Sequence, residues 1–472
     1  MTKYSARRNN AKRTGFVRLA ISTLAITISV SSHGALNANE MARLGLEGTE
    51  LTPAGAVRAG NSEGTIPAWK NEAVKAPSSF KTGMFHPDPF ASDEVAFTIS
   101  NSNYQQYSDK LTAGQKEMFE IYPEYFMNIY KTRRTAVFKP YIYDAALENA
   151  KKAESFKSKN GRLGFKHAVI SWAFPIPRNG DEALLNQVTR PLQPWIESWD
   201  NAAAVTSSGD YVLSEISVQQ HWTWSEPDNT VENFDPSVDS MFYFQTIKAP
   251  AKLAGQVIVA NDPVHFVDKF RSAWVYNPGQ RRVKRAPQIV HDSPLTASDG
   301  LATTDQKFGL NGPKDRFDYK LLGKREVYIP YNSYKINSGD LKNDDVISPS
   351  GRLNQNYVRY ELHRVWVVEA SLREGHRHDY SKRVFYLDED SWWIALMDGY
   401  DHDGDIWRLQ EIHSLMWYDV GFLGSTLEVQ YDMSANRMLA MNLDNEMDAP
   451  DFSVRLKKRY FTPASIRRRG VR

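Results

Sequence analysis

The second half of the chain is a series of short segments rich in β-branched and aromatic residues, and short polar turns separate them. Residues 383–387 end at the turn 388–390, and the chain returns through 392–398. Parallel neighbours need long crossover connections, and no helix-length insert separates these segments. The sequence therefore predicts an antiparallel sheet. Its predicted strands are 211–218, 241–247, 255–259, 272–276, 281–285, 325–329, 359–370, 383–387, 392–398, 406–411, 426–431 and 437–441.

Several predicted strands are apolar on both faces, as residues 365–368 (Val-Trp-Val-Val) show. A sheet with one face in water alternates polar and apolar residues more cleanly. We therefore expect both faces to be covered, one of them by helices or loops. The other face is covered either by an apolar ligand or by a second layer of protein, and the sequence leaves both open.

Three helices are expected before the strands. The first runs from Thr112, a candidate N-cap, to residue 120, the second covers 144–154 with Asp144 at its start, and the third covers 181–188. The chain thus has an α+β composition of elements. Residues 35–110 contain many Pro and Gly and are expected to form an extended irregular segment on the surface.

The N-terminus predicts export. Residues 1–18 carry six basic and no acidic side chains, residues 19–30 are mostly apolar, and small residues follow at 31–35. This is the pattern of a signal peptide, and the apolar run is shorter than a membrane span needs. We assign the signal peptide to residues 1–34. An uncleaved anchor is the alternative.

The composition narrows the function further. The chain has no cysteine, which excludes disulfides, thiolate metal sites and a lipidated N-terminal cysteine. Without the leader, 52 basic residues stand against 56 acidic ones, a balance that does not favour nucleic-acid binding. The motifs of serine hydrolases, zinc proteases, phosphate loops and dinucleotide sites are absent, so no catalytic residue and no cofactor is predicted.

Two clusters of residues are candidate metal sites. Asp398, Asp401, Asp403 and Asp405 suggest calcium, but the spacing does not fit an EF-hand loop, and a turn between strands explains them better. His376 and His378 would share one face of a strand, but no third ligand can be assigned. We predict no metal site.

Basic residues near the middle of the chain are a candidate anion site. Arg282 and Lys284 alternate with Arg281 and Arg285, so each pair faces one side of a strand. Arginine suits carboxylates and anionic head groups, although a solvated strand explains the run equally simply. Residues 451–472 end in further arginines and are expected to be a frayed basic tail.

Several segments resemble one family of Gram-negative bacteria, the domain-of-unknown-function 1329 family, whose members are described as similar to outer-membrane lipoprotein-sorting proteins. The resemblance extends from about residue 40 to about residue 450. It rests on AWVYNPGQRRVKRAP (273–287), DRFDY (315–319), YIPYN (328–332), RYELHRVWVVE (359–369), RVFYLDEDSW (383–392) and Tyr400-Asp401 followed by Gly404 and Trp407-Arg408.

The resemblance implies a fold like that of the periplasmic Lol lipoprotein carriers. In that fold an incomplete antiparallel barrel curls around a few helices and encloses an apolar cavity. It also implies neighbours in the envelope, namely an inner-membrane transporter of the resistance-nodulation-division class and an outer-membrane protein. We expect one such domain at 111–450. No catalytic residue carries over.

The leading hypothesis is a non-catalytic periplasmic carrier for a lipid or other hydrophobic compound, peripheral to the outer membrane at most. Arg282 and Lys284 would hold the head group. A docking module without its own ligand is the alternative, and an envelope hydrolase is the third hypothesis. The expected apolar ligand face consists of Trp274, Tyr276, Trp366, Val368 and Trp393.

Overall fold

The computed structural model describes residues 34–286 and 289–469, which belong to one unit, Ser32–Arg472. Its helices are α1 (Ala38–Ala42), α2 (Ala113–Ile121), α3 (Pro140–Lys152), α4 (Gly180–Thr189), α5 (Asn343–Val346) and α6 (Pro463–Arg469). Its strands are β1 (Phe97–Ser100), β2 (Phe126–Tyr130), β3 (Glu154–Lys157), β4 (Leu163–Lys166), β5 (Trp195–Val205), β6 (Tyr211–Trp222), β7 (Asp239–Ile247), β8 (Val257–Pro263), β9 (Ser272–Asn277), β10 (Arg282–Arg285), β11 (Phe317–Pro330), β12 (Tyr360–Leu372), β13 (Lys382–Asp388), β14 (Ile394–Tyr400), β15 (Ile406–Trp417), β16 (Phe422–Asp432) and β17 (Arg437–Leu443).

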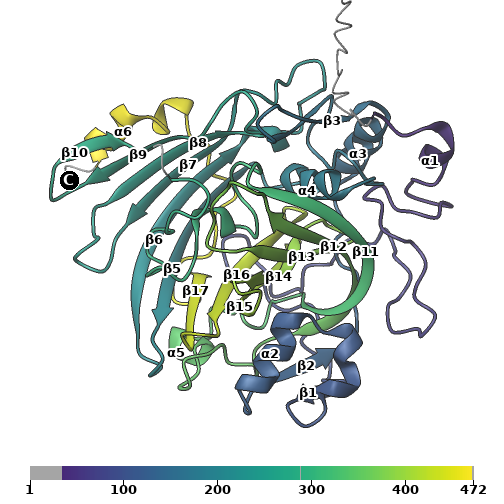
Figure 1. The fold of residues 1–472 in the computed structure, drawn as a ribbon, viewed down its shortest axis with the longest axis horizontal. Coiled ribbons are helices and arrows are strands. Elements are labelled where there is room, and N and C mark those ends of the chain that lie inside the picture. Colours follow the sequence, from purple (N-terminus) through teal and green to yellow (C-terminus); the bar gives the residue numbers. More distant parts are fainter. Residues whose placement is uncertain (1–33, 287–288, 470–472) are drawn as a thin grey trace, which may run out of the picture. The chain divides into compact units, whose positions relative to one another are not determined.

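One large curved sheet contains all of these strands except β3 and β4, which form a separate pair (Figure 1). Two antiparallel meanders, β11 to β17 and β5 to β10, join where β17 pairs with β5. The sheet is open, because β11 pairs only with β12 and β10 only with β9 among the described strands. These pairings confirm the predicted α+β fold with a large antiparallel sheet. One pairing is parallel, between β2 and the start of β12.

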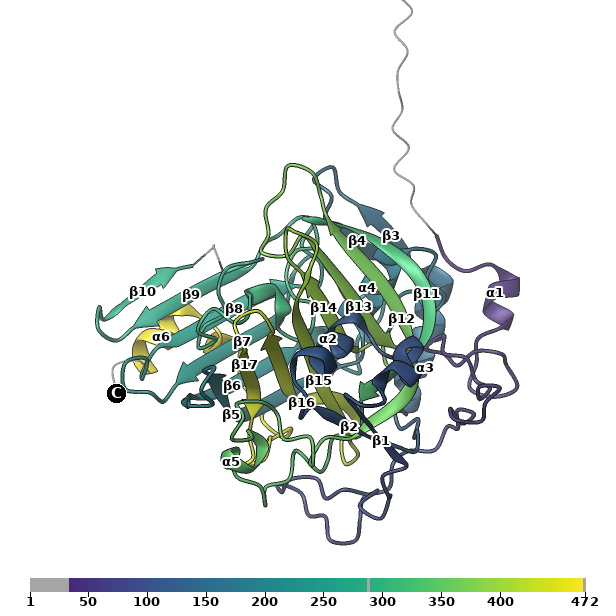
Figure 2. The same cartoon turned by 60° about the horizontal axis from the view of Figure 1, so that its bottom comes forward.

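The β12 region has protein on both faces. Val365 and Val367 pack in a core with Met118 and Phe119 of α2, whereas Val368 packs in a second core with Ile142 of α3 and Leu184 of α4. Figure 2 shows α2 on one side of this part of the sheet and α4 on the other. The two-sided apolar pattern at 365–368 is therefore explained here by two protein layers.

The helices begin largely where the sequence indicates. Thr112 caps α2, and its hydroxyl accepts a hydrogen bond from the backbone N–H of Gln115 at 3.2 Å. Asn179 caps α4 in the same way. The second helix was predicted to start at Asp144, but α3 starts at Pro140, because proline suits the first helical position.

Both terminal segments of the described residues pack on the rest of the fold. Residues 35–110 are mostly irregular, as expected, although β1 within them pairs with β2. The expectation of a frayed tail is wrong as far as residue 469, because α6 follows Phe461 and packs on β8 to β10 (Figure 1). Phe461 and Ile466 are buried there against Phe242 and Tyr276.

The predicted signal peptide lies outside the described residues except for Gly34, so it remains a prediction. In the part of the chain that the structure describes, no helix has the length and hydrophobicity needed to cross a membrane.

Candidate ligand cavity

A divided cavity lies on one face of β5 to β8, here called the inner face. On the opposite face Phe461 and Ile466 pack against β7 and β8, and α6 packs on β8 to β10. The cavity consists of three adjoining hollows of about 80, 90 and 70 Å³. We call them the first, second and third hollow. Phe308 belongs to the wall of all three hollows.

The strands supply an apolar wall. On β6 the even-numbered residues face the cavity, so Val218 borders the first and second hollows and Trp222 borders the first and third. Met241 of β7 borders the second and third hollows, and Ala260 of β8 borders the second. Such a wall favours the burial of an apolar ligand, at roughly 25 cal/mol per Å².

A long connection between β10 and β11 covers the inner face and carries Phe308. Phe308 has a φ of 59°, an unusual value for a bulky residue, and Gly309 follows with a φ of 82°. A Cβ at Gly309 would lie 2.8 Å from the Cβ of Ile394, so only glycine fits against β14. Glu428 fixes the connection, since its Oε2 accepts a hydrogen bond from the Phe308 N–H at 3.1 Å.

Charged groups interrupt the apolar wall. Asp200 borders the first and second hollows, and burial raises its pKa to about 6. Lys307 borders the same two hollows, and Tyr243, Glu428 and Asp200 raise its pKa against the opposing effect of burial. Asp200 and Lys307 each favour the charged form of the other, so the first and second hollows combine an apolar wall with a pair of opposite charges.

The structure places one residue of the expected apolar ligand face at this cavity. Trp393, the residue before β14, borders the first hollow. Trp274 and Tyr276 of β9 pack on the opposite face of the sheet with Phe461 and Ile466. Their role in ligand binding stays a prediction.

Trp366 and Val368 lie in the core between β12 and the helices. The ring of Trp366 stacks on Trp392 with a centroid distance of 5.5 Å, and the Lys324 Nζ lies 4.5 Å from its centroid. Val368 has no exposed surface. Both residues lie in one hydrophobic core with Trp393, but neither borders the three hollows.

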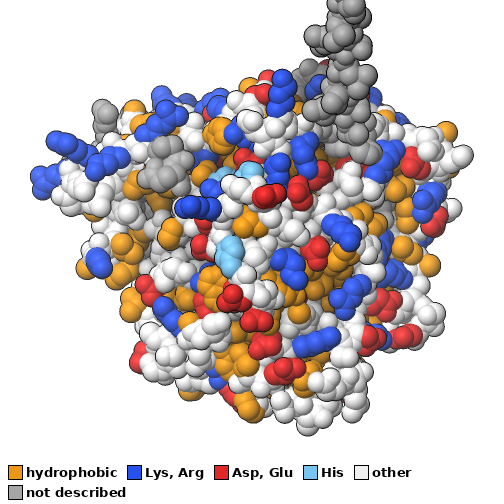
Figure 3. Space-filling model, in the orientation of Figure 1, with side chains coloured by type: hydrophobic (Ala, Val, Ile, Leu, Met, Phe, Trp, Pro, Cys, Tyr) orange, Lys and Arg blue, Asp and Glu red, His pale blue; other side chains and the backbone are white. Residues whose placement is uncertain are grey.

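Arg282 and Lys284 are exposed on β10, an edge strand of the sheet. Figure 3 shows basic side chains gathered over this strand at the left of the molecule. Charged residues on an edge strand prevent pairing with other chains. The structure does not bring these two residues to the cavity.

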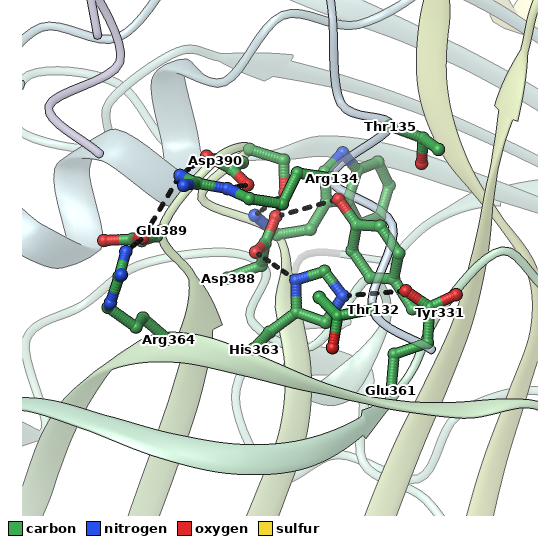
Figure 4. A network of polar contacts seen from close by, with 12 residues as sticks. Thr132, Arg134, Thr135, Tyr331, Glu361, His363, Arg364, Asp388, Glu389 and Asp390 are labelled. Atoms are coloured by element: carbon green, nitrogen blue, oxygen red, sulfur yellow. Dashed lines mark hydrogen bonds and ion pairs between the residues drawn. The ribbon is translucent and has the colours of Figure 1, made fainter. Parts of the chain in front are cut away.

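A second cluster of polar groups is buried beneath β12 (Figure 4). His363 Nε2 lies 3.2 Å from Glu361 Oε2, and His363 Nδ1 lies 3.8 Å from Asp388 Oδ1. Arg134 donates two hydrogen bonds to the carboxylate of Asp390, at 2.8 and 2.6 Å. Burial and the charge of Asp390 raise the pKa of Asp388 to about 6.

His363, Asp388 and Asp390 have the spacing of metal ligands, but they are at most 3% exposed and Arg134 already engages both oxygens of Asp390. Arg134 also donates to the carbonyl of Val57 at 2.9 Å. The cluster thus connects the irregular N-terminal segment to the turn between β13 and β14, which is a structural role.

The acidic side chains considered for calcium have separate hydrogen-bond partners. Asp401 Oδ1 accepts the N–H groups of Asp403 and Asp405 at 3.0 and 2.9 Å, which makes a turn. Asp398 is buried and accepts a hydrogen bond from Thr112 Oγ1 at 2.9 Å, at the N-terminus of α2.

The two histidines differ as well. His378 is buried with its Nε2 3.1 Å from Asp305 Oδ2, whereas His376 is exposed. The turn and loop interpretations fit the structure.

A larger cleft of about 750 Å³ lies outside the sheet, between residues 83–93 and 334–341. Aromatic side chains line it, among them Phe90 and Tyr334. Its arginine, Arg359, is already engaged by Glu361 at 2.6 Å and by Asp93 at 2.8 Å. This cleft is built from loops, and it lacks the continuous apolar strand wall of the inner cavity.

Comparisons with known proteins identify relatives of the whole chain. Residues 98–467 match the family model described as "Protein of unknown function (DUF1329)". An uncharacterized protein of Pseudomonas aeruginosa is 40% identical over 459 residues, which cover 96% of this chain and 97% of that protein.

Solved structures with weaker similarity were also found. A putative outer membrane lipoprotein-sorting protein domain from Vibrio parahaemolyticus has a TM-score of 0.40 and 11% identity, covering 61% of this chain and 97% of that one. A DUF1329 family protein from Desulfovibrio piger has a TM-score of 0.39 and 14% identity, covering 60% and 95%. The family match and the Pseudomonas relative together show that this chain belongs to the DUF1329 family of proteins of unknown function.

Proposed function

We propose that this protein binds a lipid or another hydrophobic compound in the periplasm and carries it as an accessory to an envelope transport system. The observation that supports this function most directly is the inner cavity. Val218, Trp222 and Met241 give it an apolar wall, and Phe308 borders all of its hollows. Proteins bind apolar ligands in sites of this kind, with a few polar groups to orient them.

Each hollow alone is small for a lipid, since sites for drug-sized ligands measure about 300–1,000 Å³. Phe308 borders all three hollows, and it belongs to a connection rather than to a strand. In the proposed bound state the ring of Phe308 moves aside and the hollows merge into one elongated site.

The proposed location rests on the sequence of the leader. A basic stretch, an apolar stretch and small residues at 31–35 support export and cleavage. The mass of the protein recovered from a periplasmic extract tests this, because cleavage near Gly34 or Ala35 removes the whole leader.

Native mass spectrometry of the mature periplasmic protein, followed by organic extraction, tests the binding function. We expect a stoichiometric hydrophobic adduct that organic solvent releases. A mass equal to the bare chain, unchanged after incubation with envelope lipids, would contradict a carrier and favour the docking module.

The proposed partners are an inner-membrane transporter of the resistance-nodulation-division class and an outer-membrane protein. They are supported only by the resemblance to the family. Stable co-purification of such a protein with the mature chain is the expected result, and its absence after mild cross-linking would contradict this part of the proposal.

A further inference from the structure

In the wall of the third hollow, two buried cations form no ion pair with any carboxylate of the described residues. This hollow, of about 70 Å³, lies between the end of α4 and strands β7 and β8. Arg190 and Lys314 both belong to its wall. Unpaired charges are costly to bury, so two of them at one small cavity call for an explanation.

Arg190 directly follows α4 and is only 4% exposed. Its Nη1 donates a hydrogen bond to the carbonyl of Gln187, but its Nε has no hydrogen-bond partner among the described residues. No described carboxylate forms an ion pair with its guanidinium. Burial lowers the pKa of Arg190 to about 9.

Lys314, which also belongs to the wall of the third hollow, is likewise a buried cation bonded to a backbone carbonyl. It is 8% exposed, and its Nζ donates to the carbonyl of Gly312 at 2.9 Å. Burial lowers its pKa to about 7, and the positive charge of Arg190 contributes to the lowering. Asp305 and Asp262 raise the pKa of Lys314 in opposition to burial, but neither forms an ion pair with it among the described residues.

The other polar groups of the hollow do not neutralise this charge. Asp262 belongs to the wall, but Arg271 binds both of its oxygens, at 2.9 and 2.6 Å. The indole N–H of Trp224 is buried without a described acceptor. One acceptor, Gln187 Oε1, also lacks a partner, so unsatisfied donors exceed unsatisfied acceptors.

We propose that the third hollow binds the oxyanion of an amphiphilic ligand, a carboxylate or a phosphate monoester, while the apolar part of that ligand lies in the first and second hollows. The inference rests on the proposed function, because it requires a ligand in the inner cavity. An oxyanion would supply the acceptors that Arg190, Lys314 and Trp224 lack. The planar guanidinium suits such a group because it donates parallel hydrogen bonds.

The experiment compares ligands that share one chain and differ at the head. The mature protein is loaded with the uncharged dye N-phenyl-1-naphthylamine, which fluoresces in apolar sites. Dodecanoate, dodecyl phosphate, dodecan-1-ol and inorganic phosphate then compete below their micellar concentrations. We expect both anionic amphiphiles to displace the dye at concentrations about tenfold lower than the alcohol, since one charge-assisted hydrogen bond is worth that much.

Two variants test whether the anionic head group binds in the third hollow. Arg190→Gln and Lys314→Met should each remove most of this anion preference and leave displacement by dodecan-1-ol unchanged. Arg285→Gln and Lys252→Met are matched controls, because both residues are exposed. Urea unfolding of every variant checks that the fold is kept.

The outcomes separate the two proposals. If all three amphiphiles displace the dye equally, or if Arg190→Gln and Lys314→Met both keep the preference, the head-group inference is overturned and the carrier function stands. If inorganic phosphate binds as tightly as dodecyl phosphate, the hollow takes a free anion and the amphiphile is excluded. If no amphiphile displaces the dye, the proposed function fails and the inference fails with it.

Discussion

The guanidinium carbon of Arg190 lies 4.1 Å from the centroid of the Trp393 ring, and no described carboxylate pairs with it. This contact joins the end of α4 to β14, and it brings a cation to the wall of the inner cavity. Arg134 is buried to a similar extent, at 8% exposure against 4%, but Asp390 and Glu389 neutralise it. Two buried arginines thus differ in their partners.

This difference predicts that replacing the two arginines has unequal effects on stability. Arg134→Met should lower the free energy of unfolding by about 3–5 kcal/mol, because it leaves the buried carboxylate of Asp390 without its cationic partner. Arg190→Met should change it by about 1 kcal/mol at most, because the cost of an unpaired buried charge disappears together with the stacking on Trp393. Urea unfolding followed by tryptophan fluorescence measures both. An equal loss in the two variants would show that Arg190 has a partner of comparable strength.

The lowered pKa of Lys314 predicts that the stability of the protein depends on pH. Its pKa is lowered from 10.5 to about 7, chiefly by burial. The unfolded chain therefore binds the proton more tightly, and the contribution of this group to stability rises with pH between about 7 and 10. The charges that act on it are those of Asp305, Asp262, Arg190 and Arg383.

Lys314→Met removes this contribution, so the difference in melting temperature between wild type and variant should change across that range. We expect the variant to gain most relative to wild type near pH 7. A difference that is constant from pH 7 to pH 10 would contradict the buried, unpaired amine.

Removing the Phe308 ring should enlarge the cavity. Phe308→Ala should merge the three hollows and lower the dissociation constant for an uncharged ligand, because the ring no longer has to move. The expected cost in unfolding free energy is roughly 1–3 kcal/mol, below that of a fully buried ring, because Phe308 is partly exposed. Phe270→Ala is the control, since Phe270 is 44% exposed and does not border the hollows. Dye titration of both variants measures the effect, and equal affinities would mean that Phe308 does not obstruct the site.

The anion site expected from the sequence gives a contrasting prediction. Arg282 and Lys284 lie on the edge strand β10, and the structure does not bring them to the hollows. Arg282→Gln combined with Lys284→Gln should therefore leave the dodecanoate preference intact. Loss of that preference in the double variant would place the head group at β10.

Much of the fold could be predicted because its pairings are local. Short turns such as 388–390 leave only antiparallel neighbours, and eleven consecutive pairings within the two meanders follow chain order. Strand β5 was missed because Asp200, Asn201 and three alanines give it a weak β-propensity. Its partners β6 and β17 hold it in the sheet, and the pairing with β17 joins residues about half the chain length apart, such as Val205 and Met438.

The site could be predicted only in part because it depends on contacts between distant segments. Trp393 was expected at an apolar face, but nothing near Arg190 in the sequence indicates that the two side chains would meet. Lys314 and Phe308 lie in a Gly-rich and Asp-rich connection, where a solvated loop is the ordinary expectation. Only the folding of that connection onto the inner face buries them.

Binding of an apolar ligand in the inner cavity is tested most directly by a substitution in the cavity wall that blocks the cavity. Val218 is 3% exposed and borders two of the hollows, whereas Val212 lies on the same strand and is 64% exposed. Val218→Trp should fill the site at a cost of roughly 1–3 kcal/mol, and Val212→Trp should leave it open.

Titration with N-phenyl-1-naphthylamine, on variants whose fold is verified by circular dichroism, provides the measurement. We predict that Val218→Trp weakens dye binding at least about tenfold while Val212→Trp binds like the wild type. A folded Val218→Trp protein that binds the dye with wild-type affinity would contradict the account and place the ligand elsewhere, with the cleft at 83–93 and 334–341 as the next site to test.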